Sequence, residues 1–320
     1  MLFQGIRQHF FLTKTKFGFI FKKDLRNFNL NIFCSKVLIC LFAFLEVCMA
    51  IIAISRQVAA LGDEVASRLS EKLNYRFINR KEIEERILKL GFKPDKLKKY
   101  DEKKPGFFAS LVKERDEYLD YLQTAILDAA SEGNCILIGR GAFAVLASLP
   151  NLLSLRFVAS NEVRLERLKK EFNWNDKLAQ CRIDESDMNR RGFHKSFFNI
   201  DIDDPTQYMA VLNTGIFDVE KTSDAIKVMV EHFSTPEIEK EGLKKLSELQ
   251  KCQHLVNKLI FNHKIKIEFL RAVMEDNVIT LQGVADSSVL VEKALNIART
   301  ECPGFEIKSS VSVIQDFKAY

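Results

Sequence analysis

The segment Ile51–Leu69 constrains the fold of this chain more than any other, because its pattern changes twice over a short distance. It opens with Ile51–Ile54, an unbroken apolar run typical of a strand that is buried on both faces. Ser55–Gly62 follow as a turn, and Val65 and Leu69 then recur at helical spacing. In open α/β sheets such a turn lies at the carboxyl end of a parallel strand, where free N–H groups of the next helix favour an anion. The segment therefore predicts a phosphate site.

The net charge of +5 over 320 residues comes from one end of the chain. Residues 1–48 hold seven Lys/Arg and two Asp/Glu, which leaves 41 basic and 41 acidic residues in the rest. A neutral body lacks the electrostatic footprint of a nucleic-acid-binding protein, so no nucleic acid is expected as a partner. The hydrophobic content of 47% is typical of a globular protein with a sizeable core.

The cysteines indicate a reducing compartment. Three of the seven lie within residues 1–48, and the other four are far apart with no CxxC pair. This spacing favours neither a disulfide framework nor a zinc site, and we predict a cytoplasmic protein with no metal held by cysteine.

Residues 1–48 are interpreted as a disordered leader or a misassigned start, because Met49-Ala50 directly precede the first predicted strand. A membrane anchor is the alternative, since residues 37–54 are apolar apart from Glu46. Glu46 is costly in lipid, and the second half of this run is needed as a strand. A membrane is therefore not the expected partner.

Strands alternate with helices through residues 49–235, which predicts an α/β fold with a parallel sheet and helices on both faces. The expected strands are Ile51–Ile54, Tyr75–Ile78, Cys135–Ile138, Leu152–Val158 and Tyr208–Leu212. The first expected helix begins after Gly62. The others run from Asn79 to Leu90, from Phe108 to Glu132, from a cap at Asn161 or Ser160 to Lys170, from Trp174 to Arg191 and from Ser223 to Phe233.

Several motifs then occur in the order typical of one enzyme family. They are Ile54-Ser55-Arg56, Gly139-Arg140-Gly141, Val158-Ala159-Ser160 before Arg164 and Arg167, a D-x-x-D-x-x-R spacing at Asp184, Asp187 and Arg190, Asp203-Asp204-Pro205, and Val211-Leu212-Asn213-Thr214. On these residues the segment 49–235 resembles the cytidylate kinase-like family of P-loop nucleoside monophosphate kinases. The resemblance implies ATP with Mg²⁺, a nucleotide as ligand, and phosphoryl transfer to a nucleoside monophosphate or a similar small acceptor.

The donor side departs from the pattern G-x-x-x-x-G-K-[ST], in which glycine amides wrap the phosphates and the Lys reaches their oxygens. Here Asp63 follows Gly62 where the pattern has its Lys, and Glu64 stands at the Ser/Thr position. One interpretation is an ordinary strand–helix turn capped by Asp63. The other is a divergent phosphate loop, in which Arg56 or a lid arginine supplies positive charge and Glu64 reaches Mg²⁺. The resemblance implies donor binding by Arg56, Ala59, Ala60, Leu61, Gly62, Asp63 and Glu64.

On the acceptor side the resemblance implies contacts from Arg140, Asp187 and Arg190. Arg140 follows a buried strand between two glycines, and a guanidinium there suits a monophosphate. The alternatives are a surface ion pair at Arg140 and an i,i+3 surface pair between Asp187 and Arg190. Glu85 stands where cytidylate kinases keep an Arg on the second helix, which counts against CMP as the acceptor.

A basic stretch around Gly192 corresponds to the lid of the kinase fold. Arg182, Arg191 and Lys195 are predicted to stabilise the transferring phosphoryl group, since this chemistry depends on charge neutralisation. A solvated basic helix is the alternative. His194 is interpreted as structural, and Asp204-Pro205 as a helix N-cap with Pro at N1 rather than as part of a metal site.

The last part of the chain changes character. Residues 236–251 predict a charged helical linker, and residues 252–317 predict a small α+β domain of helix, strand pair, helix and strand. The residues Val-Ile-Thr-Leu-Gln-Gly-Val-Ala (278–285) and Cys-Pro-Gly-Phe (302–305) give it a resemblance to a BON domain. Such a module implies binding of another protein or a small ligand without chemistry of its own.

Two functions follow from these patterns. The first is an ATP-dependent phosphotransferase of the cytidylate kinase type. The second is a catalytically impaired kinase-fold module that senses a nucleotide or binds a partner through its tail.

Overall fold

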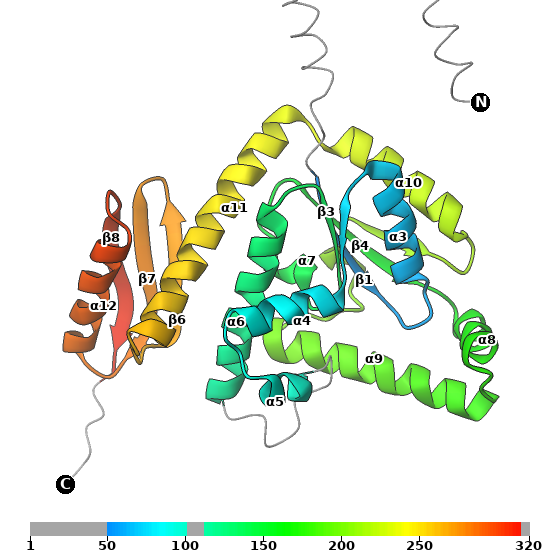
Figure 1. Ribbon diagram of the computed structural model, residues 1–320, viewed down its shortest axis with the longest axis horizontal. Helices are drawn as coiled ribbons and strands as arrows, with labels where there is room; N and C mark the ends of the chain where they lie inside the picture. The colour runs from blue at the N-terminus through cyan, green and yellow to red at the C-terminus, as the bar shows by residue number, and fades with distance from the viewer. Residues whose placement is uncertain (1–49, 101–111, 315–320) are drawn as a thin grey trace, which may run out of the picture. The chain divides into compact units, whose positions relative to one another are not determined.

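The computed structural model describes residues 50–100 and 112–314 of the chain. Five parallel strands form one sheet in the order β2-β3-β1-β4-β5 (Figure 1). The central strands are largely apolar and buried, as expected when helices cover both faces of a parallel sheet. The strands are β1 (Ile51–Arg56), β2 (Arg76–Ile78), β3 (Cys135–Ile138), β4 (Leu152–Val158) and β5 (Ala210–Asn213).

Side chains alternate along β1 between two hydrophobic clusters. Ile51 and Ala53 pack on one face of the sheet, and Ile52 and Ile54 on the other. Helices α4, α6 and α9 contribute to the first cluster, and α3 and α10 to the second. The predicted α/β architecture is confirmed. The helices are α3 (Gly62–Leu73), α4 (Arg80–Lys89), α5 (Pro94–Leu97), α6 (Val112–Ser131), α7 (Ala142–Val145), α8 (Asn161–Phe172), α9 (Asp176–Phe198) and α10 (Val219–Phe233).

The register of the sheet brings three strand ends to one edge. Ile54 of β1 lies beside Ile138 of β3 and Leu155 of β4. The turns that follow these strands therefore meet at the carboxyl edge of the sheet, at the switch in strand order where open α/β sheets bind ligands.

Helix α9 is longer than the sequence predicts. The expected helix ends near Arg191, whereas α9 continues through Gly192 to Phe198. Phe193 and Phe197 extend the buried face of the helix, and this packing outweighs the low helix propensity of one glycine. Asn175 caps the start of α9 by accepting a hydrogen bond from the Leu178 N–H (2.9 Å).

The prediction for the last strand of the sheet is also shifted. Tyr208 was expected to begin this strand, but it ends the 3₁₀ turn Pro205–Gln207, and β5 begins at Ala210. The Asp204 carboxylate accepts a hydrogen bond from the Thr206 N–H (2.9 Å), which confirms the predicted N-cap with Pro at N1.

A second, three-stranded sheet follows in the order β6-β7-β8, with β6 and β7 antiparallel and β7 and β8 parallel. The predicted order of helix, strand pair, helix and strand is confirmed. Helix α11 continues beyond the predicted end at Lys251 and then into the π-helical turn Lys258–Asn262. Residues 265–269 alternate between apolar and charged side chains, which is typical of a strand, but β6 begins only at Glu268, after a turn with φ of 55° at Lys264. The elements are α11 (Pro236–Asn257), β6 (Glu268–Glu275), β7 (Val278–Ala285), α12 (Ser288–Glu301) and β8 (Glu306–Val313).

Helix α11 is shared by two cores. Leu246 belongs to the cluster that includes α6, whereas Leu255 and Leu259 belong to the cluster beneath the second sheet. Gly242 lies so close to Asn151 that an added Cβ would meet its side-chain oxygen at 2.0 Å. Helix α11 is therefore packed against the kinase-like part of the chain and is more than a solvated linker.

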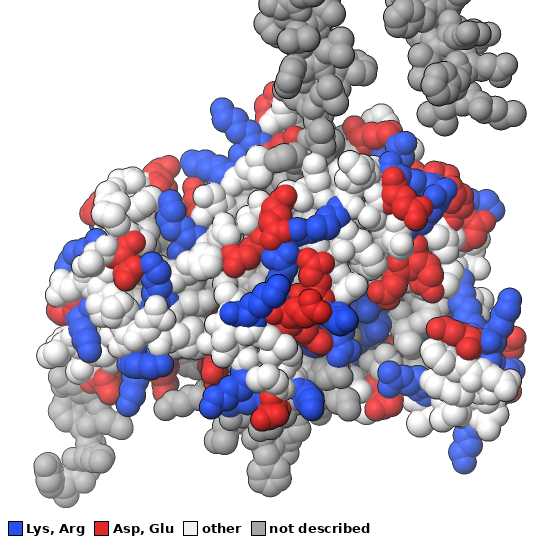
Figure 2. All heavy atoms as spheres, in the orientation of Figure 1, with Lys and Arg blue, Asp and Glu red and all other residues white. Residues whose placement is uncertain are grey.

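Figure 2 shows Lys and Arg interspersed with Asp and Glu over the face in view, in agreement with the balanced charge of residues 49–320. Within residues 50–100 and 112–314, no helix has the length and apolar character needed to cross a bilayer. The interpretation of residues 1–48 lies outside the described residues.

Candidate functional site

The turn after β1 keeps the backbone shape of a glycine loop without its glycines. Ala59 has φ of 58° and Leu61 has φ of 52°, both in the left-handed region that favours glycine. Leu61 is the N-cap of α3, and no side chain caps this helix. The interpretation of Asp63 as the cap is therefore wrong, and the N–H groups at the start of α3 are not covered by a capping side chain.

Three arginines from α8 and α9 donate hydrogen bonds to carbonyl oxygens of this loop. Arg164 Nε lies 3.0 Å from Val58 O, and Arg167 Nη1 lies 2.9 Å from Ala59 O. Arg190 Nη1 donates to the carbonyl of Arg56. These bonds fix the outward-facing carbonyls, so the loop shape is maintained by side chains from two other helices.

Arg167 differs from the other two in its surroundings. Its Nη2 donates to Thr214 O (2.6 Å) at the end of β5, and within the described residues it forms no ion pair. Burial lowers its pKa, and the nearby Glu64 opposes that shift. Arg167 is thus a partly buried cation beside the turn that leads into α3. Within the described residues it has no carboxylate partner.

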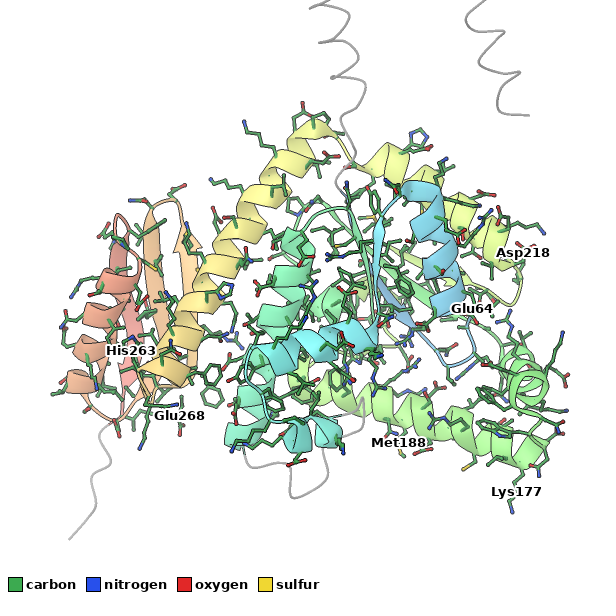
Figure 3. All side chains as sticks on the ribbon, viewed as in Figure 1. Glu64, Lys177, Met188, Asp218, His263 and Glu268 are labelled. Atoms are coloured by element: carbon green, nitrogen blue, oxygen red, sulfur yellow. The ribbon has the colours of Figure 1, made fainter. Side chains whose placement is uncertain are left out.

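The residues predicted to bind the donor lie together at this turn. Figure 3 shows Glu64 in the first turn of α3. The Asp63 side chain is 62% exposed, and its carboxylate is 3.9 Å from Arg56 Nη2, a weak surface contact. Thr214 Oγ1 donates to Ala60 O (3.0 Å), which ties β5 to the same loop.

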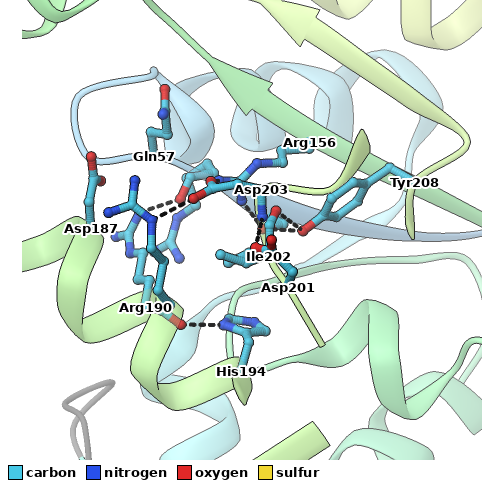
Figure 4. Close-up of polar contacts among 12 residues, drawn as sticks. Gln57, Arg156, Asp187, Arg190, His194, Asp201, Ile202, Asp203 and Tyr208 are labelled. Atoms are coloured by element: carbon cyan, nitrogen blue, oxygen red, sulfur yellow. Dashed lines mark hydrogen bonds and ion pairs between the residues drawn. The ribbon is translucent and has the colours of Figure 1, made fainter. Parts of the chain in front are cut away.

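A second network crosses the edge of the sheet and was not foreseen as a whole (Figure 4). The Asp203 carboxylate accepts hydrogen bonds from Arg156 Nη2 and Arg191 Nε, each at 2.5 Å. Arg156 also donates to Ser55 Oγ (3.0 Å) and lies over the Tyr208 ring. Burial alone would raise the pKa of Asp203, but the two guanidinium groups hold it below its ordinary value.

Arg140 is enclosed in what we call the Arg140 cluster, formed with Glu84, Tyr100 and Tyr118. Its Nη1 donates to Tyr100 O (2.5 Å) and Tyr118 Oη (3.4 Å), and its Nη2 pairs with Glu84. The Arg140 side chain is 1% exposed, so the alternative of a surface ion pair is wrong. Arg140 itself holds the pKa of Glu84 down against the effect of burial, together with Arg80.

The predicted site residues on α9 make contacts with other helices that the sequence pattern does not indicate. Asp187 accepts two hydrogen bonds from Arg164 Nη2, both at 2.9 Å, so it joins α9 to α8. An arginine from another helix is therefore a partner of Asp187, which the spacing along α9 does not indicate. His194 is 5% exposed, and its Nδ1 is 2.8 Å from Arg190 O, as its structural interpretation predicts.

The three lid cations do not meet at one point. Arg191 reaches the Asp203 network, whereas Arg182 is half exposed and paired with Glu185 on the helix surface. Lys195 is exposed. Arg182 and Lys195 are about 20 Å apart along α9, given the rise of an α-helix, so they cannot both contact one phosphoryl group without a large movement.

A cavity of about 10 Å³ lies where the turns after β1 and β3 face α9, and its lining includes Ser55, Arg56, Arg190 and His194. It has room for about one water molecule. A larger ligand at this point therefore requires α9 to move relative to the sheet.

Arg156 is the residue that sequence reasoning missed most clearly. It is 5% exposed within the strand Leu152–Val158, whose other residues apart from Ser154 are apolar. Because an arginine is almost never buried without a partner, its position in this run was a signal for a nearby carboxylate.

Part of the chain is similar to known proteins. An uncharacterized protein from Eubacterium ventriosum superimposes with a TM-score of 0.46 at 19% identity, over 57% of this chain and 99% of that one. The cytidylate kinase of Methanocaldococcus jannaschii is 29% identical over 171 residues, which is 52% of this chain and 90% of that protein. The cytidylate kinase of Pyrobaculum islandicum is 28% identical over 192 residues, 58% of this chain and 94% of that protein. The sequence profile of the cytidylate kinase-like family matches residues 51–216, and the chain belongs to that family.

Proposed function

We propose that residues 49–235 form an ATP-dependent phosphotransferase that acts on a nucleoside monophosphate or a similar small acceptor. The observation that carries this proposal is the loop Arg56–Leu61, which keeps glycine-like φ values at Ala59 and Leu61 beside the cation of Arg167. Left-handed φ costs an alanine or leucine about 1–3 kcal/mol and persists where surrounding contacts impose it. Such strain is typical of functional sites.

In this proposal the donor phosphates lie against the N–H groups at the start of α3. Arg167 supplies the positive charge that a lysine supplies in the P-loop pattern, and Arg56 adds to it from the end of β1. The carboxylates of Asp63 and Glu64 repel the negatively charged terminal phosphate of ATP, so the nucleotide requires its Mg²⁺ for binding. The described residues hold no group of three His, Cys, Asp or Glu side chains that could grip a metal by themselves. In this proposal Mg²⁺ arrives with the nucleotide, and Glu64 is the carboxylate that contacts it.

The acceptor site in this proposal is formed by Arg140, Asp187 and Arg190. The candidates for stabilising the transferring phosphoryl group are Arg182, Arg191 and Lys195. Arg191 is the best placed of these three, because Asp203 holds it at the edge of the sheet. The bound acceptor would replace part of the charge compensation that Asp203 and Glu84 now provide.

The proposal is tested by phosphoryl transfer from ATP with Mg²⁺ over a panel of nucleoside monophosphates and small hydroxylated acceptors. Arg167→Ala should lower kcat/KM about 10²–10³-fold, and Arg140→Lys should weaken turnover while keeping the charge of the buried cluster. Lys170→Ala is the matched control, because Lys170 is an exposed cation on the same helix as Arg167. Absence of turnover on every acceptor, with nucleotide binding retained in calorimetry, would exclude the enzyme.

A second candidate function is a kinase-fold module that binds a nucleotide without transferring phosphate. It is supported by Asp63 and Glu64 at the start of α3, since two carboxylates there oppose a triphosphate. The same calorimetry separates the two functions, because a sensor binds nucleotide with Mg²⁺ but leaves the terminal phosphate in place.

We also propose that residues 252–317 form a BON-like binding module, joined through residues 236–251. The order of α11, β6, β7, α12 and β8, with two helices packed on one face of a three-stranded sheet, supports this proposal. Its partner would be another protein or a small ligand. Pull-down of the full chain against a variant truncated after Thr235 tests it, and equal recovery of every bound protein and small molecule would count against it.

A further inference from the structure

The interface between α6 and α11 carries a row of polar contacts in addition to the buried apolar side chain of Leu246. Asp128 accepts from Gln250 Nε2 (2.6 Å) and lies 2.9 Å from His254 Nε2. One turn further along, Asn257 Nδ2 donates to Thr124 Oγ1 (2.6 Å). Hydrogen bonds of this kind contribute about 1 kcal/mol each, and they fix which residues of α11 lie against α6.

An aromatic contact completes this interface at the end of α11. The Phe261 ring, placed by the π-helical turn, stacks on Tyr121 of α6 with centroids 4.5 Å apart. Phe261 is partly buried against the cluster that contains α6, although it belongs to the C-terminal part of the chain. The C-terminal domain therefore contacts α6 through a side chain of its own.

From Tyr121 the aromatic contacts continue without a gap to the Arg140 cluster. Tyr121 packs on Phe92 (5.4 Å), and Phe92 packs edge-on against Tyr118 (5.7 Å). Tyr118 stacks on Tyr100 (4.5 Å), and its hydroxyl lies 3.4 Å from Arg140 Nη1. Packed aromatic side chains in a dense core have discrete arrangements, so a shift at one end is transmitted to the other.

We propose that the docked C-terminal domain restrains the acceptor side of the site, because Phe261 and the polar contacts of α11 hold α6 and thereby keep Arg140 inside its cluster. Arg140 is 1% exposed in this arrangement, so a phosphate cannot reach its guanidinium until Tyr118 and Glu84 move. Undocking of α11 frees α6 to make that movement. The inference rests on the proposed function only in taking a phosphate-bearing acceptor as the ligand of Arg140.

Two substitutions in the full chain test this restraint. Phe261→Ala removes the aromatic contact with α6, and Asn257→Ala removes a polar contact with α6. Phe269→Ala is the matched control, because it removes the same ring from a position in the same domain that is 58% exposed. Amide hydrogen exchange is followed in residues 118–125 of α6 and 139–142 after β3, and CMP affinity is measured by calorimetry.

The first two variants should raise exchange about tenfold in both segments and bind CMP about tenfold more tightly, whereas the control should do neither. Unchanged exchange in residues 139–142, or weaker CMP binding in the variants, overturns the inference. If neither the wild-type protein nor the variants bind CMP, CMP is not the acceptor, and exchange in residues 139–142 alone decides the inference. The proposed function is judged separately, by phosphoryl transfer over the panel of acceptors.

Discussion

Arg167 donates a hydrogen bond to the main-chain oxygen of Ala59 (2.9 Å), and this contact joins helix α8 to a loop residue with φ of 58°. In the proposed function this guanidinium supplies the positive charge that the turn after β1 needs in order to hold phosphate. The loop has lost the lysine of its superfamily pattern, yet the structure keeps a positive charge beside it from another helix.

The first prediction concerns that charge. Arg167→Ala should lower kcat/KM for phosphoryl transfer about 10²–10³-fold, the usual cost of removing one group that stabilises developing charge. Arg167→Lys should recover part of the loss, because it keeps the charge but cannot bridge Ala59 O and Thr214 O. Steady-state kinetics with Lys170→Ala as the control measures both effects, and equal activity in all variants would refute the role.

The second prediction concerns the strain in the loop. Ala59→Gly should stabilise the protein by about 1 kcal/mol, because glycine adopts a left-handed φ without the steric cost that alanine incurs. Ala60→Gly should instead destabilise it, since Ala60 is 1% exposed and has no positive φ. Urea unfolding of the two single variants gives the comparison, and destabilisation by Ala59→Gly would show that the loop is not strained.

The third prediction concerns the carboxylate that bridges two arginines. Asp203→Asn should destabilise the protein by about 2 kcal/mol, because Arg156 is buried and would lose its charged partner. The pKa of Asp203 is held below its ordinary value, so its stabilising effect is present above about pH 4 and is lost as pH falls through that lower pKa. Acid unfolding of wild type and variant should therefore differ at neutral pH and converge at low pH.

The fourth prediction concerns pH and the α6–α11 interface. Burial raises the pKa of Asp120 to about 7, and the negative charge of Asp116 adds to this increase. The hydrogen bond from Gln253 and the positive charge of Arg271 in β6 oppose it. The hydrogen bond to Asp128 raises the pKa of His254, against burial and Lys258. Both groups hold a proton more firmly when α11 is docked, so docking should weaken as pH rises from about 4 through 7.

Hydrogen exchange in residues 250–257, corrected for intrinsic rates, should therefore increase between pH 5.5 and pH 8. Asp120→Asn removes the buried charge and should stabilise docking at pH 8 by roughly 2 kcal/mol, with little change at pH 5. His254→Gln should reduce protection at pH 5.5 and have a smaller effect at pH 8. A wild-type profile that is flat in pH would contradict this interpretation.

The strand and helix pattern was readable from the sequence, because runs such as Ile51–Ile54 and Cys135–Ile138 have one stable place in a parallel sheet. The order of motifs also led to the correct family. The boundaries that shifted did so for local reasons. Phe193 and Phe197 carry α9 past Gly192, and the turn at Asp204 takes Tyr208 out of β5.

The partners of the charged residues could not be obtained in the same way. Spacing along α9 shows that Asp187 and Arg190 share a face, but it cannot show that α8 presents Arg164 to that face. Arg140 likewise follows β3 as predicted, yet only the packing of α4 and α6 brings Glu84 and Tyr118 around its guanidinium.

The sequence by itself determined the parallel sheet, the position of the turn after β1 and the α+β character of the C-terminal part, because these depend on local periodicity and on the burial of apolar runs. Only the tertiary structure decided which carboxylate compensates each arginine and that α11 belongs to two cores. Those relationships depend on side chains from distant segments meeting in space, and neither the period nor the composition of one segment encodes them.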